Sequence, residues 1–284
     1  MTLMLGLTLV LAVFVGITLG LLGGGGSILT VPLLVYVAGM EAKEAIATSL
    51  LVVGVTSAVG AISHARAGRV QWRTGLTFGV AGMTGAYAGG RLAEFIPGQW
   101  LLIAFALMMM ATALAMLRPG REVDPNEAPT HLPTARVLLD GLVVGLVTGL
   151  VGAGGGFLVV PALALLGGLP MPVAIGTSLV VIAMKSMAGL GGYLASVTID
   201  WPVAAMVTAA AVLGALVGGR VIGQVPAQTL RGLFGWFVLV MAIVIGAQEA
   251  PNAGWTWVVL AAGGIFLVGT WVVLRHHQTA TSPD

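Results

Sequence analysis

The sequence predicts an all-α polytopic membrane protein with two inverted repeats, each a glycine-broken re-entrant or hairpin element plus three transmembrane helices, and one extra C-terminal helix. Three observations support this prediction. The 284 residues are 58% hydrophobic and 8% charged, with a mean hydropathy of +1.06. Apolar runs of membrane-spanning length recur, and one block of sequence occurs twice. Because a water-soluble chain needs roughly 25% charged residues, the composition excludes a soluble fold.

We expect a transmembrane helix wherever an apolar run approaches the ~20 residues that cross a hydrocarbon core of about 30 Å. In chain order these runs are 3–22, 45–64, 74–93, 99–117, 137–151, 173–195, 201–222, 229–247 and 254–274. Two shorter runs, 27–38 and 156–168, each follow a glycine run and are too short to span the core alone. We predict that they are half-helices or re-entrant segments.

A polar stretch divides the chain near its middle. It contains four prolines among several charged residues, a composition typical of a connector. The predicted parts are a first transmembrane repeat (1–117), a polar cytoplasmic linker (118–136), a second transmembrane repeat (137–247), and a final transmembrane helix with a short C-terminal tail (248–284).

The two halves share a sequence repeat at an offset of 129 residues. GLLGGGGSILTVPLL, which starts at Gly20, aligns with GLVGAGGGFLVVPAL, which starts at Gly149. In the same register AIATSL aligns with AIGTSL, Trp72 with Trp201, and the Gly-Gly-Arg segment that ends at Arg91 with its counterpart. Glycine, proline, tryptophan and arginine coincide more often than apolar composition explains, so the core consists of two copies of one unit.

The basic residues favour an inverted arrangement of the two copies. If each broken element counts as one crossing, the eleven basic residues in loops divide six against five. If each element enters and returns, nine lie on one side and only Lys43 and Arg91 on the other. Cytoplasmic loops are enriched in Lys and Arg, so the second arrangement is favoured, with the C-terminus in the cytoplasm.

The glycine runs indicate an anion site. Each precedes an apolar half-helix, so free backbone N–H groups and the positive end of a helix dipole are expected at membrane depth. Inverted copies would bring the two runs together near the midplane, where many transporters hold their substrate. The alternative is that these glycines only permit close helix packing.

Two further polar features lie within the spans. Thr48-Ser49 and Thr177-Ser178 occur at matching positions, and their hydroxyls can donate to substrate oxygens or bond their own helix carbonyls. Lys185 lies near the centre of a span, where a cation is costly unless an anionic substrate, carbonyls or loss of its proton compensates it, or it reaches the interface. The predicted substrate-binding residues are Gly23, Gly24, Gly25, Gly26, Ser27, Thr48, Ser49, Gly152, Gly154, Gly155, Gly156, Thr177, Ser178 and Lys185.

The doubled glycine signature followed by proline, the A-I-x-T-S-L segment and the G-G-R helix end resemble the TauE/SafE sulfite-exporter family of membrane permeases. The resemblance extends from about Gly20 to Gly246 and implies movement of sulfite, thiosulfate or small organosulfonates such as sulfoacetate across bacterial inner membranes, coupled to an ion gradient. The residues that match the family signature are Gly23, Gly25, Gly26, Pro32, Thr48 and Ser49 in the first copy, and Gly152, Gly154, Gly155, Gly156, Pro161, Thr177 and Ser178 in the second. Lys185 is not among the matched residues.

We therefore expect a secondary transporter that moves a small anion by alternating access and is not an enzyme. The expected partners are the anionic substrate, the lipid bilayer and, as candidate coupling ion, a proton. No nucleic acid, cofactor, metal ligand or catalytic residue is expected, and the oligomeric state stays open. The alternatives are an intramembrane enzyme, which the absence of cysteine and of H-E-x-x-H and G-x-S-x-G motifs disfavours, or a membrane assembly factor or receptor.

Overall fold

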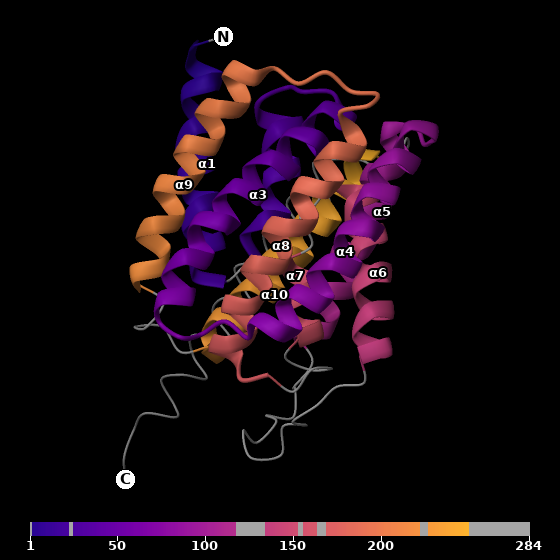
Figure 1. The fold of residues 1–284 in the computed structure, drawn as a ribbon. Coiled ribbons are helices and arrows are strands. Elements are labelled where there is room, and N and C mark those ends of the chain that lie inside the picture. Colours follow the sequence, from indigo (N-terminus) through magenta and orange to yellow (C-terminus); the bar gives the residue numbers. More distant parts are fainter. Residues whose placement is uncertain are drawn as a thin grey trace. The chain divides into compact units, whose positions relative to one another are not determined.

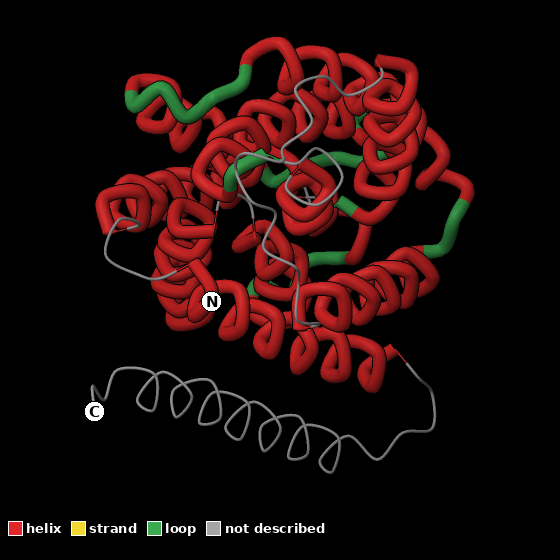
Figure 2. Tube along the Cα trace, turned by 90° about the horizontal axis from the view of Figure 1, so that it is seen from below, coloured by secondary structure: helices red, strands yellow, loops and turns green. Residues whose placement is uncertain are grey.

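The computed structural model describes residues 2–22, 25–117, 134–152, 156–163, 169–221 and 227–249, and every regular element in these ranges is a helix. Figure 2 shows the described chain as helices joined by short loops. Among the described residues, four helices are long and apolar enough to cross a membrane. Their spanning segments are Met4–Leu21, Ala42–Arg66, Pro172–Tyr193 and Trp201–Gly219. The predicted all-α membrane class is thereby confirmed.

The long helices coincide with the apolar runs. The first half contains α1 (Thr2–Leu22), α3 (Ala42–Arg66), α4 (Trp72–Leu92) and α5 (Gly98–Leu117). The second half contains α6 (Thr134–Val151), α8 (Met171–Tyr193), α9 (Trp201–Val221) and α10 (Ala227–Glu249). Several helices extend a few residues past their apolar runs, because a helix continues into the interface where charged side chains are solvated. The start of α6 lies inside the linker predicted at 118–136. The predicted span 254–274 lies outside the described residues.

The short elements follow the glycine runs. In the first half η1 (Gly25–Leu29), α2 (Thr30–Pro32) and the π-helical turn η2 (Leu33–Val37) succeed one another without a gap. Both η1 and η2 contact α1, so the chain turns back along the helix that it has just left. In the second half α7 (Gly156–Pro161) occupies the matching position. A helix followed by a returning short segment is the hairpin that the sequence predicts.

The helices form two compact units. The larger unit comprises residues 1–101 and 122–222, and so contains α1 to α4 and α6 to α9. The smaller unit comprises residues 102–121 and 223–284, and in it a side chain at Gly246 of α10 would contact Ala106 of α5. Helices from both sequence halves therefore share the larger unit.

Within the larger unit the two copies are interleaved. α1 of the first copy packs on α9 of the second, and the matching pair α6 and α4 packs in the same way (Figure 1). Both contacts depend on glycine. A side chain at Gly85 of α4 would collide with the Leu142 carbonyl of α6, and one at Gly214 of α9 with the Val13 carbonyl of α1. Gly214 is the counterpart of Gly85 in the repeat, so the same backbone-to-backbone approach occurs twice.

The equivalent helices α3 and α8 pack against each other in opposite directions. Gly54 of α3 lies beside Ser186 and Met187 of α8, whereas Gly60 lies beside Leu179. Advancing along α3 therefore means retreating along α8. If the two copies were related by an axis parallel to the helices, α3 and α8 would run in the same direction. Their antiparallel packing therefore supports inverted copies. Their orientation in a bilayer remains a prediction.

Candidate functional site

Among the described residues, Lys185 is the one Lys, Arg, Asp or Glu whose side chain is buried. Its side chain is 1% exposed, although it lies midway along α8. Nζ donates a hydrogen bond to Oγ1 of Thr148 on α6, at 3.1 Å. On α4, Gly82 lies so close that a Cβ there would be 3.7 Å from Cβ of Lys185, so the lysine stem occupies the space that the glycine leaves free. No Asp or Glu side chain is buried among the described residues. The hydrogen-bond partner of Nζ is thus a neutral hydroxyl.

The two glycine-led segments meet in the structure. η1 and α7 contact each other, as we predicted for two inverted copies. Gly25 and Gly156 are the first residues of η1 and α7. A side chain at Gly26 would collide with the backbone of Leu19, and Ser27 next to it is fully buried. Four of the predicted site residues lie outside the described residues, namely Gly23, Gly24, Gly154 and Gly155.

Gly152 directly follows the last residue of α6 and contacts α3. Its φ of +72° is the left-handed conformation that favours glycine after a helix, and its N–H donates to the Thr148 carbonyl at 3.0 Å. Oγ of Ser49 donates to the Gly152 carbonyl at 3.0 Å, and this bond is buried. A side chain at Gly152 would collide with Ile46 of α3. Ser49 and Gly152 therefore join α3 to the turn that leads into the second glycine run.

The other predicted hydroxyls have different surroundings. Oγ1 of Thr177 accepts the N–H of Gln71 at 2.9 Å, just before α4 begins. Oγ of Ser178 donates to the Ile175 carbonyl one turn back, at 2.7 Å. Oγ1 of Thr48 is buried without a hydrogen-bond partner in the described part of the chain. The Thr48-Ser49 and Thr177-Ser178 pairs are thus not bonded alike, although they match in sequence.

The two hydroxyl pairs also lie apart. Leu50, next to Ser49, packs beside Gly189 of α8. Eleven residues of helix separate Gly189 from Ser178, about 16 Å at the rise of an α-helix. Lys185 lies between these two levels. The structure therefore brings Ser49 to Gly152 and η1 to α7, but it does not gather all four hydroxyls at one point.

Sequence reasoning missed Thr148, which is fully buried. The sequence indicates that Lys185 needs a polar neighbour, because a lysine inside a span is costly without one, but it does not indicate which residue that neighbour is. Other polar atoms are buried without a partner among the described residues. They are Oγ1 of Thr30 and Thr56, Oγ of Ser57 and Ser186, and Nδ1 of His64. Thr56 is the repeat counterpart of Lys185, so the two copies carry different groups at this level.

Comparison with known proteins identifies the family. The model for the sulfite exporter TauE/SafE family matches residues 8–245, which is most of the chain. The chain belongs to the TauE/SafE family. This confirms the resemblance seen in the glycine, A-I-x-T-S-L and G-G-R segments. No solved structure matches the chain.

Several similar proteins are described as probable membrane transporter proteins. One from Xylella fastidiosa (strain 9a5c) is 36% identical over 238 residues, which cover 81% of this chain and 90% of the relative. YdhB of Bacillus subtilis is 28% identical over 222 residues, covering 76% and 89%. A Methanocaldococcus jannaschii protein is 30% identical over 202 residues, covering 69% and 74%. The family and these names indicate a multi-pass membrane transporter rather than an enzyme.

Proposed function

We propose that this TauE/SafE protein is a secondary transporter for a small anion, with sulfite, thiosulfate or a small organosulfonate such as sulfoacetate as the substrate class. The observation that carries the proposal is the side chain of Lys185, which is fully buried in a membrane-spanning helix with a neutral hydroxyl beside its Nζ. An isolated charge in a low-dielectric interior is strongly unfavourable. A bound anion would compensate it, whereas a cationic substrate would be repelled.

The substrate would lie where the glycine-led segments meet. Contact between η1 and α7 supports a site supplied by both copies, in which the runs Gly23–Ser27 and Gly152–Gly156 offer backbone N–H groups and Lys185 offers charge. Thr48, Ser49, Thr177 and Ser178 would line or brace the approaches. Backbone N–H groups and an ammonium suit sulfonate and sulfite oxygens because both are hydrogen-bond donors.

Alternating access would follow from the interleaved copies. The equivalent helices α3 and α8 run in opposite directions, so each copy presents the same elements to opposite sides. Rocking of one copy against the other can then open a site between them to either side. We infer coupling to an ion gradient, with a proton as candidate, and residence in the inner membrane with a cytoplasmic C-terminus. The family name of sulfite exporter supports the sulfur-containing substrate class.

Two linked experiments test the proposal. The detergent-purified protein is titrated with sulfite, thiosulfate, sulfoacetate, sulfate, phosphate and chloride while its melting temperature is followed, because a ligand that binds the folded state raises it. We expect a selective rise with one sulfur anion, and saturable flux of that anion into proteoliposomes driven by an imposed ion gradient. Absence of both stabilisation and flux for every anion would overturn the proposal and favour a receptor or assembly role.

A further inference from the structure

Thr148 holds the ammonium of Lys185 in a defined direction. The hydroxyl of Thr148 has one proton to donate. Its Oγ1 lies 2.7 Å from the carbonyl oxygen of Val144 and 3.2 Å from that of Gly145, both in its own helix. With the proton directed there, the oxygen lone pairs remain to accept from Nζ of Lys185. The hydroxyl therefore acts as a fixed acceptor, and α6 positions a charge that belongs to α8.

The pair exists in one copy only. At the repeat offset of 129 residues, Lys185 corresponds to Thr56 and Thr148 corresponds to Leu19. The next position along the chain has the same residue in both copies, since Ser57 matches Ser186. Both partners thus differ between copies, and the copy without the lysine has an apolar residue in place of its acceptor. This difference points to one functional unit rather than two unrelated substitutions.

The ammonium has capacity to bind more. It carries three N–H donors, and Thr148 is its one hydrogen-bond partner among the described residues. The other titratable groups on the surrounding helices each lie five or more residues along their helix from the residue that lies at the level of Lys185, which is Gly54 on α3, Gly82 on α4 and Thr148 on α6. They are Lys43, Glu44, His64 and Arg66 on α3, Arg73, Tyr87 and Arg91 on α4, Asp140 on α6 and Tyr193 on α8 itself. A ligand with acceptor oxygens and negative charge would satisfy the remaining donors.

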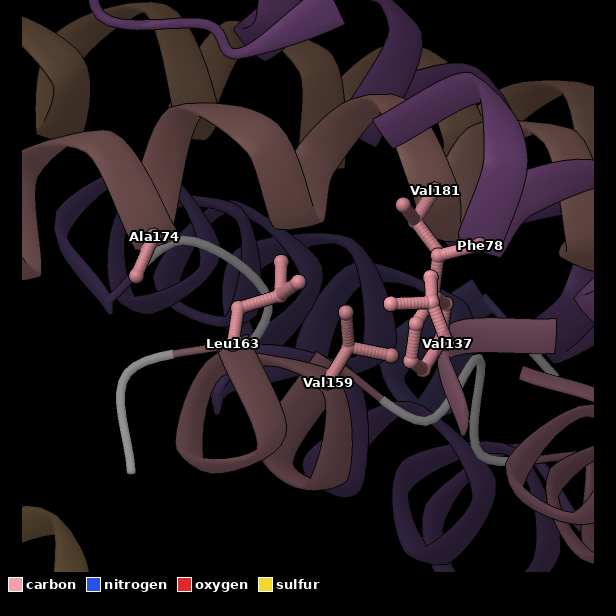
Figure 3. Close-up of a cluster of buried hydrophobic side chains, with 6 residues drawn as sticks. All are labelled: Phe78, Val137, Val159, Leu163, Ala174 and Val181. Carbon is pink, nitrogen blue, oxygen red and sulfur yellow. The ribbon is translucent and has the colours of Figure 1, made fainter. Parts of the chain in front are cut away.

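The segment that contains α7 packs on the face of α8 that carries Lys185. Val159 of α7 and Leu163 just after it share a buried apolar cluster with Ala174 and Val181 of α8 (Figure 3). Lys185 lies one helical turn beyond Val181, and residues four apart lie on the same face of a helix. The lysine stem therefore leaves α8 on the side where this cluster lies.

We propose that Thr148 is the positioning residue of a one-sided anion subsite, in which it directs the Lys185 ammonium at a sulfite or sulfonate group. This inference rests on the proposed function and deepens it, because it assigns the charge-recognising part of the site to the second copy alone. The first copy, with Thr56 and Leu19, would contribute only neutral contacts.

The test uses the full-length protein and sulfite as the probe, with the dissociation constant taken from ligand stabilisation and KM from proteoliposome flux. Thr148→Val removes the hydroxyl at nearly constant volume and is expected to weaken sulfite binding about tenfold, since hydrogen bonds to charged groups are the stronger ones. Thr148→Ser keeps the hydroxyl and is expected to stay within about threefold of wild type. The matched control is Thr8→Val, because Thr8 is also fully buried and bonds only a carbonyl of its own helix.

A double-mutant cycle separates positioning from general packing. Lys185→Gln alone is expected to weaken sulfite binding about tenfold or more, and adding Thr148→Val is expected to cause no further loss. Independent effects that multiply, or a Thr148→Val protein that binds like Thr8→Val, would overturn the positioning role. If the wild-type protein neither binds nor transports any anion of the panel, the proposed function itself fails, which is a distinguishable result.

Discussion

At the residue scale, the two lysines of this chain have opposite environments. Lys185 is buried in the middle of α8, whereas Nζ of Lys43 donates to the Glu94 carbonyl in an exposed bond at 2.9 Å. A buried charge that is compensated by a ligand contributes to binding, while an exposed bond at the membrane border contributes little. We therefore expect the same residue type to serve recognition in one place and anchoring in the other.

This contrast predicts unequal consequences of charge removal. In proteoliposomes at sulfite concentrations below KM, Lys185→Gln is expected to lower the initial rate about tenfold or more. Lys43→Gln is expected to change it by less than about twofold. Both rates are normalised to the amount of reconstituted protein. Equal small effects would reduce Lys185 to a structural residue.

A comparison of substitutions at Gly152 and Gly39 distinguishes the cost of backbone strain from the cost of a steric collision. Both have φ of +72°, but an added Cβ meets nothing within 4 Å at Gly39 and collides with Ile46 at Gly152. Gly39→Ala is expected to cost only the left-handed backbone penalty of roughly 1–2 kcal/mol. Gly152→Ala is expected to cost roughly 1–3 kcal/mol more from overpacking. Melting temperatures in detergent measure the difference, and equal losses for the two variants would show that the approach of α3 to Gly152 is loose.

At the element scale, close helix contacts rather than side-chain size hold the copies together. α4 approaches α6, and α1 approaches α9, at glycines that recur at the repeat offset. In lipid there is little hydrophobic gain from helix association, so van der Waals contact between backbones becomes the main attraction. This explains the glycine content outside the two glycine runs.

Gly85→Ala tests that contact. The added methyl would collide with the Leu142 carbonyl, and α4 and α6 would have to separate, which is expected to cost about 1–3 kcal/mol. Gly6→Ala in α1 is the control, because nothing lies within 4 Å of its added Cβ and alanine favours a helix. We expect a lower melting temperature for Gly85→Ala and an unchanged or higher one for Gly6→Ala. A Gly85→Ala protein as stable as Gly6→Ala would contradict the close approach.

At the scale of the whole molecule, the side of the membrane on which each copy ends distinguishes inverted copies from parallel ones. The opposed directions of α3 and α8 are those of inverted copies, and nine of the eleven basic residues in loops fall on one side when each glycine-broken element enters and returns. Alternating access by rocking depends on this arrangement, because each copy must offer the same element to the opposite side.

Topology reporters give a direct measurement. Tags inserted after Arg121 and after Gln248, which lie near the ends of the two copies, are expected to lie on opposite sides of the membrane. The tag after Arg121 should be cytoplasmic. Accessibility to a membrane-impermeant reagent in intact and lysed cells distinguishes the two sides. Finding both tags on one side would favour parallel copies and remove the basis for the rocking mechanism.

The sequence by itself determined the properties that depend on local composition. Run length and hydropathy defined α1, α3 and α8, because a helix in lipid must satisfy its own backbone over the width of the core. The register of the repeat by itself pairs Lys185 with Thr56. The need of Lys185 for a partner also followed from its depth alone.

Only the tertiary structure decided which groups meet. The acceptor of Lys185 is Thr148, 37 residues away on α6, and Ser49 bonds Gly152 across 103 residues. Thr177, which matches Thr48 in sequence, instead accepts from Gln71. Such pairs depend on which helix faces pack together, and that choice is made by close contacts such as Gly85 against Leu142 rather than by the hydropathy of either segment.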